Sequence, residues 1–99
     1  MLTYQLSILT PEGQIFDDPV QSLIAPGQLG SFGVLAKHAP MVSALKPGVL
    51  KVKKSGPQQF FVVGEGVLEV DHEHNVLVLA DSARPYPTEE EARAHLNKT

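Results

Sequence analysis

The sequence predicts an all-β domain, a two-sheet antiparallel β-sandwich or flattened barrel of about ten short strands, followed by a short C-terminal helical stub. Three features support this fold class. Apolar and polar residues alternate along 2–8, as in a strand with one buried face. Further short runs of β-branched and aromatic residues follow at regular spacing. The eight glycines and eight prolines lie mostly between these runs, where chain reversals need them.

Turn signals separate the strands in order along the chain. The segment 10–13, Thr-Pro-Glu-Gly, ends the first strand, because proline presets φ and glycine accepts positive φ. A short return strand stops at Asp-Asp-Pro, and each later strand begins after a turn rich in proline, glycine or asparagine. The predicted strands are 2–8, 15–16, 20–25, 49–53, 60–63, 67–70 and 76–80. Period-two alternation predicts a core that contains Leu6, Ile8, Ile24, Leu50, Val52, Val62, Leu68, Val70, Leu77 and Leu79.

The segment 85–99 has a different pattern. Thr88 and Glu91 have the spacing of a capping box, and the acidic run 89–91 lies where the helix dipole favours negative charge. The remaining residues offer little apolar surface, so a helix of about ten residues is marginal here in isolation. We therefore predict a β domain over 1–84, and a linker with the start of a helix over 85–99.

Composition excludes several classes of function. The 99 residues form one domain with a modest core, and the absence of cysteine excludes disulfide and thiol chemistry. A formal net charge of −3 argues against nucleic-acid binding, which needs a basic face. The N-terminus lacks the features of a signal peptide, and no apolar run approaches the ~20 residues of a membrane span. Membrane contact is therefore expected only through a partner or at the surface.

No catalytic, cofactor-binding or metal-binding residues are predicted. The sequence contains neither a Walker-type phosphate loop nor a nucleophile elbow. His72 and His74 are two residues apart, but zinc needs four ligands and only carboxylates are nearby. Lys51, Lys53 and Lys54 form a basic run. A solvated face is expected there, with weak attraction to anionic lipid headgroups as the alternative.

The stretch PGQLGSFGVLAKHAPMVSALKPGVLKV, at 26–52, resembles the epsilon subunit of bacterial and chloroplast F-type ATP synthases. The blocks LTYQLSILTPEG, VVGEGVLEV, VLVLADSA and EEARA resemble the same family in the same order. The resemblance implies a non-catalytic subunit at the foot of the central stalk, between the gamma subunit and the c-ring of an enzyme that translocates H⁺ or Na⁺. Such a subunit is peripheral on the cytoplasmic face of the inner membrane, or at the thylakoid equivalent in a plastid.

The resemblance also implies which loop faces the c-ring. By themselves, the glycines between Pro26 and Val34 predict either a flexible loop or a tight hairpin. The ring-facing residues implied by the family are Gly27, Gly30, Ser31, Phe32 and Gly33, and we expect Phe32 to be exposed. Family members often carry an acidic residue at the position of Ser31. This departure argues against a charge-based contact, although not against the docking surface.

A second face is implied toward the gamma subunit. Family position assigns Thr10, His38 and Ser43 to it, and Met41 is added because small and apolar side chains surround His38. The competing interpretation is a free-standing β-sandwich that binds a small ligand or another protein. The strand pattern alone does not separate these two classes of function.

In the family, two antiparallel helices follow the sandwich and can inhibit ATP hydrolysis or bind ATP. The Arg-Ala of the ATP-binding motif appears here as Arg93 and Ala94, but Glu89 and Glu90 replace its apolar residue and aspartate. These glutamates repel phosphate, and the sequence stops at Thr99, before a second helix. We therefore expect no ATP binding and no inhibition by the tail. The alternative is a frayed end with no role.

Overall fold

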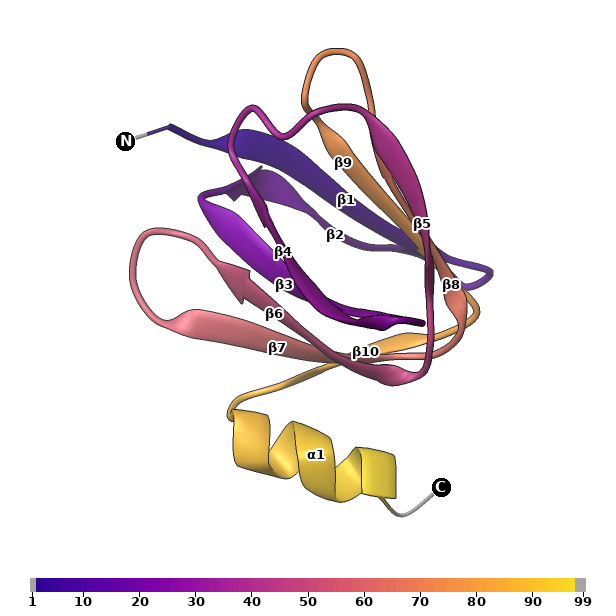
Figure 1. Ribbon diagram of the computed structural model, residues 1–99. Helices are drawn as coiled ribbons and strands as arrows, with labels where there is room; N and C mark the ends of the chain where they lie inside the picture. The colour runs from indigo at the N-terminus through magenta and orange to yellow at the C-terminus, as the bar shows by residue number, and fades with distance from the viewer. Residues whose placement is uncertain (1, 98–99) are drawn as a thin grey trace.

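The computed structural model describes residues 2–97, and within them it contains ten strands and one helix (Figure 1). The strands are β1 (Tyr4–Thr10), β2 (Gly13–Val20), β3 (Ser22–Gly27), β4 (Gly30–Leu35), β5 (Met41–Leu45), β6 (Gly48–Lys53), β7 (Gln58–Val63), β8 (Gly66–Val70), β9 (Val76–Ala80) and β10 (Ala83–Tyr86). The helix α1 spans Glu89–Asn97, and the last two residues of the predicted segment 85–99 lie outside the described residues. The predicted fold class is confirmed.

The strands follow one continuous path, β10-β7-β6-β3-β5-β8-β9-β1-β2, and β4 pairs with β3 beside this path. Every pairing is antiparallel except that of β1 with β9, which is parallel and which the strand pattern did not predict. The path curls into a flattened, nearly closed barrel (Figure 1). Phe16 of β2 meets Phe61 of β7 edge to face, with ring centroids 5.6 Å apart, so strands near both ends of the path meet across the core.

Strands β4, β5 and β10 lie outside the predicted segments, and β2 extends beyond 15–16 to Val20. The glycines of β4 give it little strand propensity, but it pairs with β3 along its whole length. β2 lies at one end of the path and pairs only with β1, and such an edge strand tolerates Pro19. Long-range pairing therefore decides these strands, rather than their local composition.

The core confirms part of the predicted set and corrects the rest. The residues buried as predicted are Leu6, Ile8, Leu50, Val52, Leu68 and Val70. The predicted core residues that lie outside the buried set are Ile24, Val62, Leu77 and Leu79. Their neighbours fill the core instead, namely Leu23, Ala25, Phe61, Val63, Val76, Val78 and Ala80. In an uninterrupted apolar run both faces are apolar, so period two does not tell which face points inward.

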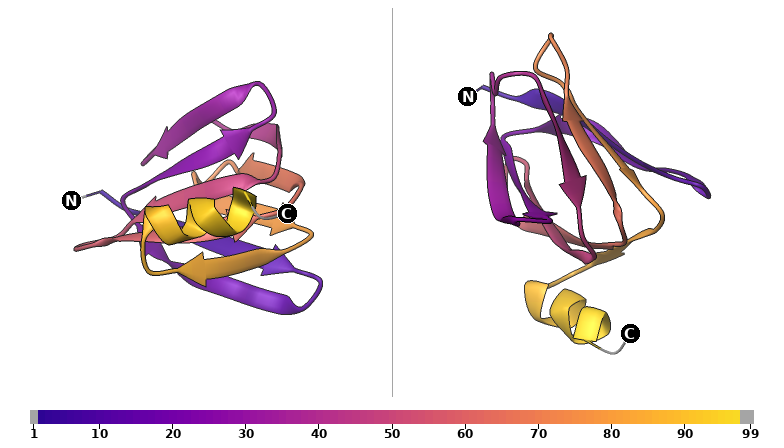
Figure 2. Two further views of the ribbon diagram at one scale, coloured as in Figure 1. Left: turned by 90° about the horizontal axis from the view of Figure 1, so that it is seen from below. Right: turned by 45° about the vertical axis from the view of Figure 1, so that its right-hand side comes forward.

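Helix α1 packs across the outer side of β6, β7 and β10, below the barrel (Figure 2). The predicted cap is present, because the backbone N–H of Glu91 donates to Thr88 Oγ1 over 3.1 Å. Ala92 is fully buried, and Val49 on β6 is only 7% exposed although it lies outside the core cluster. Packing against the barrel therefore supplies the stability that so short a helix lacks alone. No helix within the described residues has the length and apolar character to cross a membrane.

Candidate interaction surface

The glycine-rich segment predicted to face the c-ring is a hairpin between β3 and β4. Gly27 ends β3 and Gly30 begins β4, and Gly30 has a φ of 129°, which favours glycine. Phe32 is not exposed as expected, because its side chain packs partly buried against the core. Ser31 remains exposed on β4. The exposed apolar side chain is Leu29 at the turn, which is 105% exposed and which sequence reasoning missed.

The four residues predicted to face gamma lie on different elements and differ in how far their side chains are exposed. Thr10 ends β1, and His38 lies between β4 and β5. Met41 is partly buried and packs against the core, and Ser43 lies on the same side of β5. The side chain that β5 directs outward most prominently is Val42, which is 71% exposed. The side chains that β5 exposes to solvent are therefore those of Val42 and Ala44, which alternate with the predicted Met41 and Ser43.

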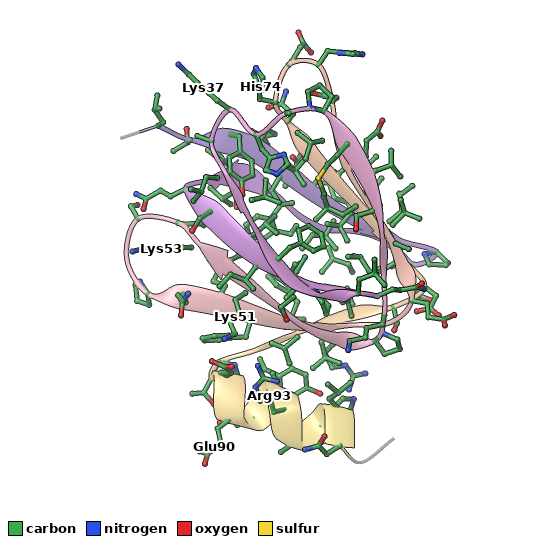
Figure 3. The ribbon with its side chains drawn as sticks, viewed as in Figure 1. Lys37, Lys51, Lys53, His74, Glu90 and Arg93 are labelled. Carbon is green, nitrogen blue, oxygen red and sulfur yellow. The ribbon has the colours of Figure 1, made fainter. Side chains whose placement is uncertain are left out.

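The connection that holds His38 is tied to the turn between β8 and β9. Nδ1 of His74 donates to the carbonyl oxygen of His38 over 2.9 Å, and Nδ1 of His38 donates to the carbonyl of Ala39 over 2.8 Å. Lys37 and His74 both have positive φ, 67° and 66°. Figure 3 shows them at the end of the barrel opposite α1. These two hydrogen bonds fix the segment before β5 against the β8–β9 turn. Residues 2–97 contain no group of three or more His, Cys, Asp or Glu side chains placed to hold a metal ion.

An exposed row of apolar side chains crosses four adjacent strands. Ala44 of β5 pairs with Val67 of β8, Val67 with Leu79 of β9, and Leu79 with Leu9 of β1. Val67 is 39% exposed and Leu79 is 47% exposed. We call these four residues the apolar row. Apolar side chains that gather on one outer face are typical of an interaction surface.

Two open grooves border the apolar row. One has a volume of about 410 Å³ and contains Leu9, Thr10 and Leu79 in its lining. The other, about 580 Å³, lies between the β3–β4 hairpin and β5, and Leu29, Ser43 and Ala44 are among its lining residues. Ala44 therefore belongs to both the row and this groove. The apolar row and the groove beside the β3–β4 hairpin are therefore continuous at Ala44.

The strands that carry the apolar row, together with the neighbouring β2, have acidic but no basic side chains. β1, β2, β5, β8 and β9 contain no lysine, arginine or histidine. Asp17 of β2 accepts hydrogen bonds from Gln5 Nε2 (2.6 Å) and Ser7 Oγ (2.9 Å). These bonds, first that from Gln5, hold the pKa of the Asp17 carboxyl below its ordinary value. The face therefore carries negative charge beside its apolar centre.

The lysine run lies elsewhere and is largely paired within the chain. Lys51 Nζ lies 2.9 Å from a carboxylate oxygen of Glu89, and Lys54 Nζ lies 3.2 Å from Asp18. Figure 3 shows Lys51 above α1 and Lys53 near the β6–β7 turn. Lys53 is exposed and has no ion pair among the described residues. The expected solvated face is thus also a site where the barrel holds α1.

The fold is a β-barrel with an apolar outer face that is continuous over four strands and bordered by open grooves. The family described as the ATP synthase, Delta/Epsilon chain, beta-sandwich domain matches residues 3–86, and this chain belongs to that family. The resemblance inferred from the sequence blocks is confirmed.

Known relatives agree with this assignment. The ATP synthase epsilon chain of Bradyrhizobium sp. (strain ORS 278) is 42% identical over 83 residues, which cover 84% of this chain and 61% of the relative. That of Nitrosococcus oceani is 37% identical over 94 residues, which cover 94% of this chain and 66% of the relative. The chain therefore spans less than two thirds of the length of these relatives.

Two solved structures have a similar fold. A chain of the Euglena gracilis mitochondrial ATP synthase, in a structure of OSCP, F1 and the c-ring, matches with a TM-score of 0.80 and 25% identity. This match covers 97% of our chain and 62% of the Euglena chain. A chain from the central stalk and c-ring of the Tetrahymena thermophila mitochondrial ATP synthase matches with a TM-score of 0.73 over 98% of our chain and 90% of its own. At 13% identity, the second match supports the fold alone.

Proposed function

We propose that this chain is an epsilon-type subunit of the central stalk of an F-type ATP synthase. In this role it docks the gamma subunit onto the c-ring and helps to couple the flow of H⁺ or Na⁺ to ATP synthesis. The observation that carries the proposal is the apolar row, which meets the β3–β4 hairpin at Ala44. The relatives that are ATP synthase epsilon chains support it. The chain itself catalyses no reaction and is peripheral on the cytoplasmic face of the inner membrane, or at the thylakoid equivalent.

The gamma subunit docks on the apolar row in this proposal. Val42 extends the row on β5, and Thr10 borders it at the end of β1. Ser43 lines the adjoining groove, and Met41 supports β5 from the core side. His38 lies just before β5, where two hydrogen bonds hold it as a fixed polar group at the edge. When gamma covers this face, each Å² of apolar surface removed from water stabilises the complex by about 25 cal/mol.

The β3–β4 hairpin is the contact with the c-ring in this proposal. Leu29 at its tip is fully exposed, and burying one leucine side chain stabilises a complex by about 1.5–3 kcal/mol. Ser31 adds a neutral polar group, so the contact is apolar and geometric rather than based on charge. Since Ala44 both lines the groove beside the hairpin and belongs to the apolar row, β5 links the two docking surfaces.

Nucleotide sensing is not part of the proposed function. Nη2 of Arg93 lies 2.8 Å from Glu89, and its Nε donates to the same carboxylate oxygen over 2.9 Å. Lys51 approaches that oxygen as well, at 2.9 Å. The guanidinium that would meet a phosphate in the family motif is therefore occupied, and the neighbouring Glu90 and Glu91 add repulsion.

Reconstitution into an F-type ATP synthase depleted of its own epsilon subunit tests the proposal. The wild-type chain should restore ATP-driven ion pumping in vesicles. Leu79→Asp should fail, because docking would bury an unpaired carboxylate at a cost of about 3–5 kcal/mol. Ile24→Asp is the matched control, since Ile24 is 40% exposed on β3, between Gly33 of β4 and Lys51 of β6. A free-standing binding module would restore no pumping even as the wild type.

The c-ring contact needs its own variant. Leu29→Ser should leave gamma binding intact but weaken assembly onto the c-ring, because it removes the exposed leucine of the hairpin. Pull-down of gamma and of the c-ring, measured separately, distinguishes the two surfaces. If Leu29→Ser assembles with the ring as well as wild type does, the hairpin is wrongly assigned.

A further inference from the structure

One carboxylate lies on the outer face of β8, between the apolar row and a hollow of about 310 Å³ whose lining also contains Gln5, Ser7 and Asp71. Glu69 of β8 pairs in register with Val42 of β5 on one side and with Leu77 of β9 on the other. Val67 precedes it by two residues and therefore projects from the same face of β8. Neighbouring strands are only about 4.8 Å apart, so all three apolar side chains flank the carboxylate. Glu69 is exposed to solvent in this chain.

Nothing within the described chain pairs with this carboxylate. Among residues 2–97, Glu69 makes no ion pair and its side chain makes no hydrogen bond. The strands β1, β2, β5, β8 and β9 supply no lysine, arginine or histidine. Asp17 on the same face differs, because Gln5 and Ser7 both donate to it. Glu69 is therefore stabilised by water alone.

Docking of a partner on this face removes that water. A carboxylate that loses its hydration without gaining donors or an opposite charge strongly opposes binding. The apolar neighbours Val42, Val67 and Leu77 have no group to offer in exchange. A partner that covers Glu69 together with the apolar row therefore binds best when it brings the compensating charge itself.

We propose that the gamma subunit places a basic side chain against Glu69 when it docks on the apolar row. This inference rests on the proposed function and specifies the chemistry of the partner surface. Arginine suits the position best, because its guanidinium is weakly hydrated and forms two parallel bonds to a carboxylate. An apolar surface without a cation would be rejected, so Glu69 fixes which partner docks and in which register.

The test compares two substitutions that remove the same charge. Glu69→Gln keeps the size of the side chain, and Glu90→Gln removes an exposed carboxylate on α1, away from the face (Figure 3). Binding of each full chain to isolated gamma is measured by calorimetry at about 50 mM and about 300 mM salt. Glu69→Gln should bind at least tenfold more weakly than wild type at low salt and should lose part of the salt dependence. Glu90→Gln should bind within about twofold of wild type.

The outcomes separate this inference from the proposed function. If Leu79→Asp abolishes binding while Glu69→Gln binds as tightly as wild type with the same salt dependence, no cation meets Glu69 and the inference alone is overturned. If the wild-type chain does not bind gamma, the proposed function and the inference are both overturned. Thermal unfolding of Glu69→Gln checks that a loss of affinity does not come from a loss of fold. Glu69→Lys should weaken binding at least a hundredfold, because it brings like charges together.

Discussion

Removing one hydroxyl group should measurably destabilise the barrel. The hydroxyl of Tyr4 donates to the carbonyl oxygen of Val34 over 2.8 Å, and both residues are buried. The bond joins β1 to β4, two strands that do not pair with each other. Tyr4→Phe deletes the donor and leaves a buried carbonyl without that partner, which costs about 1–3 kcal/mol. We expect a loss of about 2 kcal/mol and a fall of about 10 °C in the midpoint of thermal unfolding.

Urea unfolding followed by circular dichroism is the assay for this loss. Tyr86→Phe is the matched control, because the Tyr86 ring contacts the His95 ring at a tilt, with centroids 5.2 Å apart, while its hydroxyl makes no hydrogen bond within the described residues. The control should cost less than about 0.5 kcal/mol. If Tyr4→Phe costs no more than Tyr86→Phe, the Tyr4 hydroxyl does not hold β4 to β1 and the reasoning is refuted.

The same residue predicts a dependence of stability on pH. Burial raises the pKa of the Tyr4 phenol above its ordinary value, so the folded state favours the protonated form. The contribution is therefore complete below the unfolded pKa of about 10 and declines as pH rises above it. Wild type should lose stability above about pH 10 more steeply than Tyr4→Phe, which has no phenol at this position. Equal slopes for the two proteins would contradict the assignment.

Three further predictions concern the rest of the molecule. Gly66→Ala should cost about 1–3 kcal/mol in urea unfolding, because the new Cβ would meet the carbonyl oxygen of Leu79, and an unchanged midpoint would contradict the tight packing of β8 on β9. Glu89→Gln should lower the thermal midpoint at pH 7, and this effect should shrink as the pH is lowered. Lys51 and then Arg93 lower the pKa of Glu89, so its stabilisation exists above about pH 4.3 and disappears as pH falls through the folded pKa. Calorimetric titration with ATP should give no saturable binding in the micromolar range, because the guanidinium of Arg93 is already in an ion pair with Glu89.

The sequence was sufficient for the fold class and for those faces where polar residues interrupt the apolar run. Lys51 and Lys53 alternate with Leu50 and Val52 on β6, so the buried face was predicted correctly. The run 76–80, Val-Leu-Val-Leu-Ala, has apolar residues on both faces. Period two cannot choose between them, and the structure buries the set that begins at Val76. A run that is apolar on both sides is itself a sign that both faces are to be covered.

The interaction surface could be predicted only in part, because its residues meet through long-range pairing. The apolar row depends on the parallel pairing of Leu9 with Leu79, seventy residues apart in the chain. No local pattern gives that register. The family resemblance pointed to β5, but the alternation within this strand makes Val42 strongly exposed and leaves Ser43 only partly exposed, beside the hairpin groove. Leu29 was missed because the turn type that exposes it depends on where β3 and β4 pair.

The affinity of this chain for isolated gamma tests the central claim most directly. Calorimetric titration compares wild type with two variants. Leu79→Asp lies on the apolar row, and Ile24→Asp replaces a residue of similar exposure that lies outside the row. The account predicts saturable binding by wild type and Ile24→Asp, and a loss of more than a hundredfold for Leu79→Asp. If Leu79→Asp binds gamma as tightly as Ile24→Asp does, the apolar row is not the docking surface and the account is wrong.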